Sequence, residues 1–295
     1  MKSKQNLISF YNKLMPAKKS LEDTVTAGSI RKILFRSFAY AIFAYFITFF
    51  FEKTLIIGGA ILSGYSFELS YYQLKVDAGF KSWDQEAVLL IYFIPYLIQA
   101  IVLIALYIRL NNMELKPKYS RIFMLWIMLF LLYRLLGLFP AQILFKTGIY
   151  YVIDWLYIGL VFKIFGGVIT VVIFFFSGFK IFKAIIALSG TYHDHISDMG
   201  IPALLKASVL FPVFGVCLIA LIYFLPGLPV EEISGLVLII ALGVYVFIKL
   251  FGIDPDFFSF KEQLEAKSKP VWLVTYAAIS ILAIRTILGF VHLAG

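Results

Sequence analysis

The chain has 295 residues, of which 62% are hydrophobic and 15% are charged, and its mean hydropathy is +0.93. A soluble domain of this length cannot bury so much apolar surface, so the composition excludes a soluble globular protein and predicts a membrane protein. The net charge of +9 is explained by basic loops on the cytoplasmic side of a membrane, so no nucleic-acid partner is expected.

The chain is expected to divide into a cytoplasmic basic amphipathic segment, residues 1–32, and a transmembrane helical bundle, residues 33–295. In the first segment, apolar residues recur at helical spacing before Pro16, and lysines flank them. A short helix of this kind is predicted to lie on the anionic lipids of the inner leaflet, and a disordered basic tail is the alternative. The lysines that would contact the lipid surface are Lys4, Lys13, Lys18 and Lys19.

Seven apolar runs are long enough to cross a bilayer as helices, which need roughly 20 residues. They are too long and too continuously apolar for membrane β-strands, so the predicted fold is an all-α polytopic bundle. Six spans with an interfacial last helix are the alternative, because Arg285 lies inside the seventh run. The predicted spans are Ile33–Lys53, Ala87–Tyr107, Ile122–Leu144, Trp155–Gly178, Ala207–Leu225, Ile233–Phe251 and Val271–His292.

Between the first two spans, the segment "IIGGAILSGYSFELSYYQLKVD" alternates apolar and polar residues and then changes phase. Such alternation is typical of extended backbone, so the segment predicts a short strand with a bulge, or a hairpin, on the outer side.

Loop charge predicts the orientation of the bundle. The first 36 residues carry eight Lys and Arg against two acids, and the stretch from Arg109 to Arg121 carries four against one. The stretch from Glu68 to Glu86 is acidic instead, with two Lys against four acids. Because cytoplasmic loops are rich in Lys and Arg, we expect a multi-pass protein of the inner (plasma) membrane with a cytoplasmic N-terminus. Glu231 and Glu232, which have no base nearby in sequence, are expected on the outer side.

Charged residues inside apolar runs are the first candidates for function, because each is costly in hydrocarbon unless it is paired or hydrated. Arg134 lies about halfway along the third span, and Glu52 or Asp154 is expected to pair with it. This pair is either structural and buried, or it lines the path of a small, possibly anionic, solute. Lys163 is expected to reach the interface on its long stem, and Arg285 either pairs within the bundle or marks an incompletely inserted last helix.

The segment "GTYHDHISDMG" contains two of the three histidines, and it is expected in a cytoplasmic loop between spans four and five. His193, His195 and Asp198 could supply three ligands to a metal ion, which is the minimum that a zinc site usually needs. The sequence has no HExxH motif and no cysteine pair that would make the pattern specific. An ordinary polar loop is therefore favoured, with a metal site and a pH-responsive loop as alternatives, and no cofactor is predicted.

Two stretches resemble Yip1-domain proteins. These are "FYNKLMPAKKSLED", a proline in a basic amphipathic segment before the first span, and "VVIFFFSGFKIFKAIIALSGTYHDHISDMGIPALLKASVLFPVFGVCLIALIYFLPG", helices separated by a polar break. The resemblance covers about the first 40 residues and residues 160–290. It implies a non-enzymatic multi-span protein associated with membrane organisation or trafficking.

A different stretch, "FFFEKTLIIGGAILSGYSFELSYYQL", is similar in layout to intramembrane site-2-type metalloproteases. The family's HExxH motif would align with residues 51–55, where both metal-binding histidines are missing. This resemblance therefore implies at most an inactive relative.

These observations favour a scaffold or organising subunit of a membrane complex that is not an enzyme. Its partners would be lipids and other membrane proteins, or a second copy of the chain. The alternatives are a transporter with Arg134 on the solute path and a metal-dependent membrane enzyme at the His193 loop.

Overall fold

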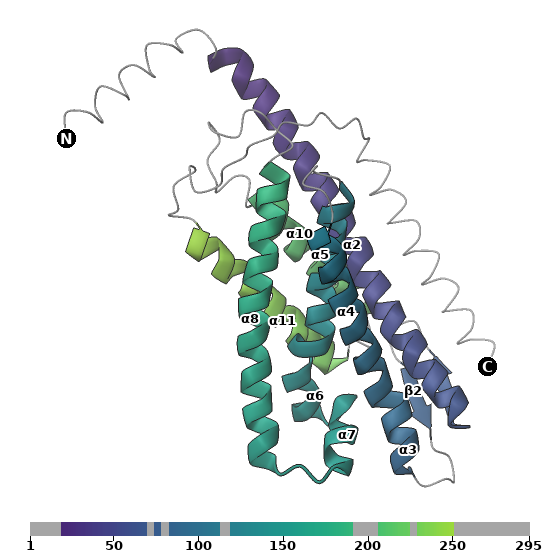
Figure 1. Ribbon diagram of the computed structural model, residues 1–295. Helices are drawn as coiled ribbons and strands as arrows, with labels where there is room; N and C mark the ends of the chain where they lie inside the picture. Colours follow the sequence, from purple (N-terminus) through teal and green to yellow (C-terminus); the bar gives the residue numbers. More distant parts are fainter. Residues whose placement is uncertain are drawn as a thin grey trace.

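The computed structural model describes residues 19–69, 74–77, 83–112, 119–190, 206–224 and 229–250. The chain is an almost entirely helical bundle (Figure 1), and six of the described helical stretches are long and apolar enough to cross a membrane. These stretches are Arg31–Leu62, Gln85–Leu110, Ser120–Phe145, Leu160–Ile186, Lys206–Tyr223 and Val230–Lys249. The chain is therefore a polytopic membrane protein, as its composition predicts.

The helices include both α-helices and short π-helical segments, which are labelled η here. The elements are α2 (Lys19–Leu62), α3 (Gln85–Val88), η1 (Leu89–Phe93), α4 (Ile94–Asn112), α5 (Tyr119–Leu132), η2 (Tyr133–Gly137), α6 (Phe139–Phe145), α7 (Ile149–Trp155), α8 (Leu160–Gly190), η4 (Lys206–Leu210), α10 (Phe211–Phe224) and α11 (Val230–Leu250). Spans two, three, five and six end within three residues of their predicted bounds. The seventh predicted span, Val271–His292, lies outside the described residues.

The predicted end of span one was wrong, because α2 continues past Lys53 to Leu62 without a break. Gly58 and Gly59, near the end of α2, look like loop residues in the sequence, but Gly59 allows close helix packing. A Cβ atom at Gly59 would lie 2.7 Å from the carbonyl oxygen of Leu90 and 2.9 Å from Cα of Ile91. The glycine therefore lets η1 pack directly on the α2 backbone. At its other end α2 begins at Lys19, so the predicted boundary after residue 32 lies within one continuous helix.

The predicted start of span four was also wrong. Trp155 is the last residue of α7, and the chain then turns through Tyr157, whose φ angle of 53° is left-handed, before α8 starts at Leu160. Hydropathy does not reveal this turn, because Tyr157 and its neighbours are as hydrophobic as the residues of a membrane-spanning helix. The helical part of span four therefore begins later than the hydropathy predicts, and α8 extends to Gly190.

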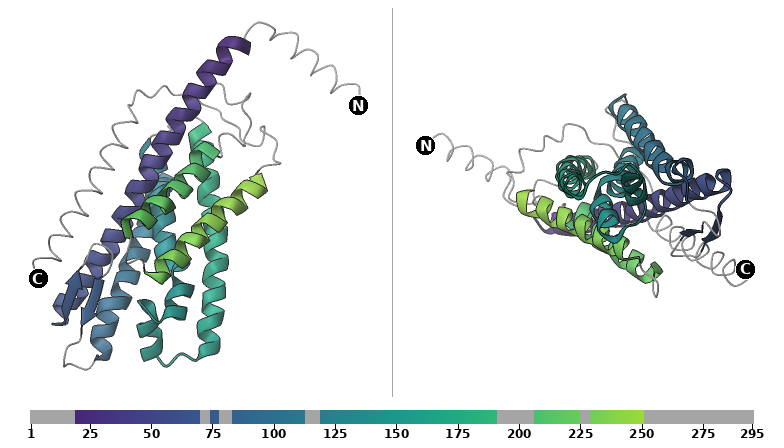
Figure 2. Two further views of the ribbon diagram at one scale, coloured as in Figure 1. Left: turned by 180° about the vertical axis from the view of Figure 1, so that it is seen from behind. Right: turned by 90° about the horizontal axis from the view of Figure 1, so that it is seen from below.

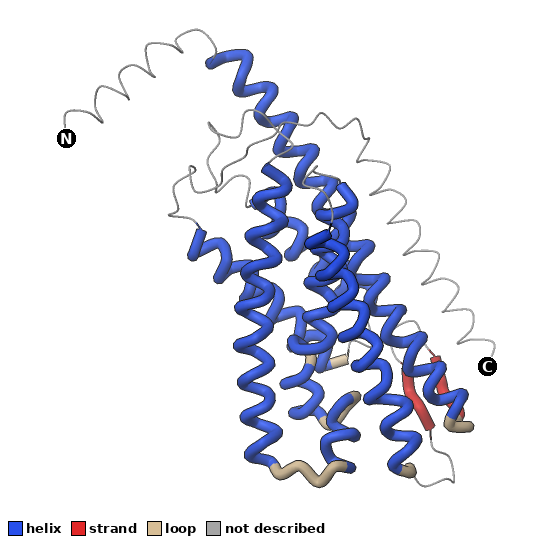
Figure 3. Tube along the Cα trace, in the orientation of Figure 1, coloured by secondary structure: helices blue, strands red, loops and turns tan. Residues whose placement is uncertain are grey.

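The predicted hairpin between spans one and two is confirmed. Strands β1 (Ser66–Leu69) and β2 (Leu74–Asp77) pair antiparallel, with Ser66 opposite Asp77 and Leu69 opposite Leu74. The strands lie beside the ends of α2 and α3, at the end of the bundle away from the start of α2 (Figure 3). We call this end of the molecule the hairpin end.

Each π-helical segment precedes a proline, namely Pro95, Pro140 or Pro212. A proline cannot donate to the carbonyl four residues before it, so that carbonyl needs another donor. Before Pro212, the freed carbonyl of Ser208 accepts a hydrogen bond of 2.5 Å from Ser37 Oγ, and Trp126 Nε1 donates to Ser37 Oγ at 3.1 Å. This chain of hydrogen bonds ties α2, α5 and η4 together in the core.

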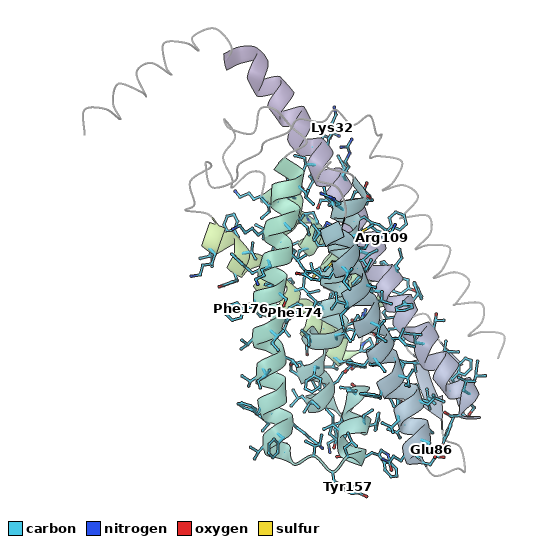
Figure 4. The ribbon with its side chains drawn as sticks, in the orientation of Figure 1. Lys32, Glu86, Arg109, Tyr157, Phe174 and Phe176 are labelled. Atoms are coloured by element: carbon cyan, nitrogen blue, oxygen red, sulfur yellow. The ribbon has the colours of Figure 1, made fainter. Side chains whose placement is uncertain are left out.

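Large aromatic side chains of the core lie along α5 and the start of η2, where Trp126, Phe130 and Tyr133 are fully buried. Helix α8 lies at the edge of the bundle and contacts it along one side. Figure 4 shows this on two neighbouring residues, because Phe174 points into the bundle whereas Phe176 points away from it. A long apolar face of this kind suits contact with lipid tails.

The last two described helices do not reach the hairpin end. In the left view of Figure 2, α11 begins about level with the middle of α8, further from the hairpin end than α6 and α7. From there it runs towards the end of the bundle where α2 starts. Gly235 in its first turns packs against Leu138 and Tyr133, so the start of α11 lies at the bend between η2 and α6. The hairpin end is consequently built from the end of α2, the hairpin, α3, α6, α7 and the start of α8. A cavity lies among α2, the hairpin, η1, α6, α7 and the start of α11.

Candidate functional site

The centre of the bundle holds three charged side chains, which we call the charge triad: Glu52 from α2, Arg134 from η2 and Glu232 from α11. Arg134 is 2% exposed, Glu52 is 6% exposed and Glu232 is 3% exposed. Arg134 Nη1 lies 3.3 Å from Glu52 Oε2 and donates a hydrogen bond to Glu232 Oε1. With all three groups ionised, the triad carries one net negative charge.

Aromatic residues enclose the guanidinium of the triad. The Arg134 Cζ atom lies 5.5 Å from the ring centre of Tyr45, 5.0 Å from that of Phe49 and 5.2 Å from that of Tyr133. Ring faces attract cations, and this attraction strengthens where water is excluded. The Tyr133 hydroxyl also donates to Glu232 Oε2 at 2.8 Å, so both oxygens of Glu232 are held.

Glu52 is held less completely than Glu232. Its Oε2 atom is buried near Arg134 but takes part in no hydrogen bond with the residues that the structure describes. A buried carboxylate oxygen normally accepts hydrogen bonds, because leaving it without them is costly. Arg134 Nε and Nη2 are likewise buried without a hydrogen-bond partner among the described residues, so hydrogen bonding in the triad is incomplete on both its basic and its acidic side.

A cavity of about 560 Å³ opens next to the triad, and we call it the triad cavity. Glu52 and Glu232 form part of its wall, whereas Arg134 does not line it. The carboxylates thus stand between the guanidinium and the cavity. The complete lining is Phe49, Glu52, Lys53, Ile56, Ser66, Phe67, Glu68, Leu74, Lys75, Val76, Tyr92, Leu138, Gln142, Thr147, Gly148, Tyr151, Pro229, Glu231 and Glu232.

Charge on the wall of the triad cavity is mostly negative. Four carboxylates line it, at Glu52, Glu68, Glu231 and Glu232, against the two ammonium groups of Lys53 and Lys75. The hairpin supplies the rim and the triad supplies the deep wall. The cavity therefore leads from the hairpin end towards the middle of the bundle, and its wall carries an excess of acidic groups, although Lys75 lies opposite Glu68 at the rim.

The remaining wall of the triad cavity carries neutral polar groups. Gln142 of α6 lines it and accepts a hydrogen bond from the Tyr96 hydroxyl of α4. Gly148, with a φ of +55°, lies so close that a Cβ atom there would be 2.9 Å from the Gln142 amide. This glycine lets the α6–α7 turn fold against Gln142 and fixes the amide at the cavity wall.

The structure brings together some of the charged residues that the sequence singles out and separates others. Glu52 pairs with Arg134, as expected, but the predicted alternative partner Asp154 does not. Asp154 lies at the end of α7 and accepts a hydrogen bond of 2.7 Å from Lys163 in the first turn of α8. The hydrogen bond from Lys163 lowers the pKa of Asp154 below its ordinary value, and Tyr150 adds to the effect.

The sequence analysis missed Glu232 as a partner and expected it in an outer loop without a base nearby. In the structure, Glu232 lies in the first turn of α11, which begins deep in the bundle. The sequence did contain one signal of a buried ion pair, which is that no basic residue lies near Glu232. A carboxylate between Pro229 and a long apolar run needs a partner from another part of the chain.

The other predicted site residues cannot be placed. The possible metal ligands His193, His195 and Asp198, the buried-charge candidate Arg285 and the lysines Lys4, Lys13 and Lys18 lie outside the described residues, and Lys19 is the first residue of α2. Within the described ranges, no group of three or more His, Cys, Asp or Glu residues could hold a metal ion.

Comparison with protein-family models, with curated proteins and with solved structures finds no match for the chain. The resemblances to Yip1-domain proteins and to site-2-type metalloproteases therefore stay predictions. The functional argument rests on the charge triad and the triad cavity.

Proposed function

We propose that the chain is a membrane protein that binds and transports a small, positively charged solute through the triad cavity. The observation that carries this proposal is the buried Glu52 carboxylate, which lies on the cavity wall and whose Oε2 atom is held by the ion pair with Arg134 but accepts no hydrogen bond from the described residues. A solute with an ammonium or guanidinium group would supply a donor. Charge-assisted hydrogen bonds of this kind are about twice as strong as neutral ones.

The composition of the wall supports a cationic solute over an anionic one. Four carboxylates against two lysines give the cavity wall an excess of negative charge, and the aromatic residues Tyr92 and Tyr151 also line it. The sequence analysis considers an anionic solute drawn by Arg134. That side chain is instead turned into the triad, behind its two carboxylates, so it supports no anion site in this cavity.

The membrane orientation belongs to the same proposal. The basic residues Lys32 and Arg109 lie at the end of the bundle opposite the acidic residue Glu86 (Figure 4). This separation of charge supports a cytoplasmic N-terminus in the inner membrane, with the triad cavity open to the outer side.

The test compares solute binding by the wild-type protein and by Glu52→Gln, which keeps the size of the side chain and removes its charge. Glu86→Gln is the matched control, because Glu86 is exposed at the hairpin end and does not line the cavity. Methylammonium and methylguanidinium, which both carry N–H donors, are the cationic probes, and pivalate and acetate are the anionic ones. Thermal stabilisation of the purified protein reports binding, and proteoliposome uptake of the radiolabelled cations reports transport.

We expect the cations to stabilise the wild-type protein and Glu86→Gln but not Glu52→Gln. Stabilisation by the anions alone, or equal effects of the cations on wild type and Glu52→Gln, would overturn the proposal. Cation binding without uptake would retain the binding site and reject transport.

The role as a scaffold subunit, which the sequence analysis favours, is the competing hypothesis. Both roles predict that removing Arg134 lowers the folded yield, because Arg134 neutralises buried carboxylates in either case. Glu52→Gln separates them, because a scaffold would lose no solute binding in this variant. A metal-dependent enzyme at the His193 loop is a third prediction, and that loop lies outside the described residues.

A further inference from the structure

A second hollow lies on the outer surface of the bundle, between α6 and α8, and we call it the α6–α8 groove. Its volume is about 630 Å³, and its lining is almost entirely apolar. It is distinct from the triad cavity and shares no lining residue with it. The lining is Pro140, Ile143, Leu144, Lys146, Tyr150, Leu160, Lys163, Ile164, Gly167, Val168, Val171 and Val172.

The groove exists because small residues of α8 face a short helix. A Cβ atom at Gly167 would lie 3.9 Å from Pro140, and one at Gly166 would lie 3.6 Å from the Phe139 ring. Both glycines therefore leave room beside α6 that a larger side chain would fill. The exposed side chains of Ile164 and Val168 form the open wall of the groove.

The depth of the groove matches one leaflet of a bilayer. From Lys163 to Val172 the α8 helix rises nine residues, which is about 14 Å at 1.5 Å per residue. Half of a hydrocarbon core of about 30 Å is about 15 Å. An acyl chain that enters from the hairpin end would thus lie beside α8 over most of its length.

The groove carries positive charge at its interfacial end. Lys146 is exposed directly after α6, and Lys163 lies in the first turn of α8. Lys163 gives one N–H to Asp154 at 2.7 Å and lies 4.5 Å from the ring centre of Tyr150. An ammonium has three donors, so Lys163 keeps two for another acceptor. With Asp154 counted, this end of the groove has one net positive charge.

We propose that the α6–α8 groove binds one anionic phospholipid from the leaflet at the hairpin end. One acyl chain occupies the apolar groove beside Gly167, and the phosphate lies between Lys146 and Lys163. The apolar part of the groove is as deep as one leaflet, and its lysines lie at the level of the lipid headgroups. This combination is complementary to an anionic phospholipid, whereas a soluble anion would have nothing to place in the apolar part. This site is independent of the proposed transport function.

The test measures the lipid that remains bound to the full chain after purification in mild detergent, by native mass spectrometry. Dioleoyl phosphatidylglycerol and dioleoyl phosphatidylcholine are offered in equal amounts, because they share acyl chains and differ in headgroup charge. Near a membrane surface, each lysine contributes a preference for an anionic lipid of about fivefold. Because Asp154 leaves one net positive charge at this end of the groove, we expect one retained phosphatidylglycerol per chain, roughly fivefold preferred over phosphatidylcholine.

Two variants test the two ends of the groove separately. Gly167→Leu fills the apolar slot and should abolish retention of both lipids, whereas Lys146→Gln should weaken phosphatidylglycerol retention about fivefold. The controls are Val161→Phe, an exposed α8 position outside the groove, and Lys180→Gln, an exposed lysine further along α8.

Three results would overturn the lipid site. Equal retention of the two lipids, or retention unchanged by Gly167→Leu, would mean that only general lipid contact occurs on α8. Displacement of phosphatidylglycerol by soluble glycerol phosphate would identify a free-anion site at the lysines instead. Because the readout is bound lipid, failure here leaves the triad cavity and its cation test unaffected.

Discussion

Replacing Arg134 by methionine tests whether the charge triad stabilises the fold as the structure indicates. Methionine fills much of the space of arginine but carries no charge, so it leaves Glu52 and Glu232 facing each other without a cation. Removing one member of a buried ion pair costs about 3–5 kcal/mol, because the remaining charge is left uncompensated. Here two like charges remain, so we expect a loss of free energy of unfolding at or above the upper end of that range.

The same prediction can be checked by removing all of the charge. The variant that combines Arg134→Met with Glu52→Gln and Glu232→Gln has no uncompensated ion, so it should recover at least half of the lost free energy of unfolding. Unfolding in mixed micelles with increasing SDS, followed by tryptophan fluorescence, measures both variants. An Arg134→Met protein that unfolds like the wild type, or a triple variant no more stable than Arg134→Met, would refute the reasoning.

Three further predictions concern other parts of the bundle. Gly59→Ala should destabilise the protein by about 1–3 kcal/mol, because its Cβ would overlap the backbone of η1. Gly58→Ala, with open space around its Cβ, should be neutral or stabilising. Equal SDS-unfolding curves for the two variants would contradict the close helix contact. Ser37→Ala removes the hydroxyl that bridges α5 to η4 and should cost about 1–3 kcal/mol by the same assay, with no change expected if water replaces the hydroxyl. The pKa of Asp154 is lower in the folded protein, so its pairing with Lys163 stabilises the fold above about pH 4 and is lost as the pH falls through the folded pKa. The melting temperature should accordingly fall more in the wild type than in Asp154→Asn between about pH 5 and pH 3, and parallel curves would exclude a role for this pair.

The membrane-spanning helices are predictable from hydropathy, because each needs a continuous apolar run and the bilayer sets its length. The errors occur where backbone geometry decides. Hydropathy does not register that Gly59 allows two helices to touch, so α2 is longer than predicted. It also does not register that Tyr157 adopts a left-handed turn, so α8 starts later than predicted.

The candidate site was partly predictable for a related reason. Arg134 and Glu52 stand out because a charge within an apolar run is costly without a partner, and the structure joins them. Glu232 lies at the border of its apolar run, where a carboxylate needs no partner if water reaches it. Only the three-dimensional placement of α11, which begins next to the η2–α6 bend, takes Glu232 out of the loop environment that its sequence position suggests.

The presence of a charge triad in the core supports the proposed binding role over a purely structural one. A buried ion triad can often be replaced by apolar residues of similar size with no loss of stability, so stability alone does not require these charges. Both oxygens of Glu232 are hydrogen-bonded, by Arg134 and Tyr133, although Arg134 Nε and Nη2 have no hydrogen-bond partner among the described residues. Glu52, unlike Glu232, keeps a buried oxygen without a hydrogen bond to the described residues, on the wall of an acidic cavity. A carboxylate that Arg134 holds in place but leaves incompletely bonded is suited to receive a donor from the cavity, which is the property that binding of a cationic solute requires.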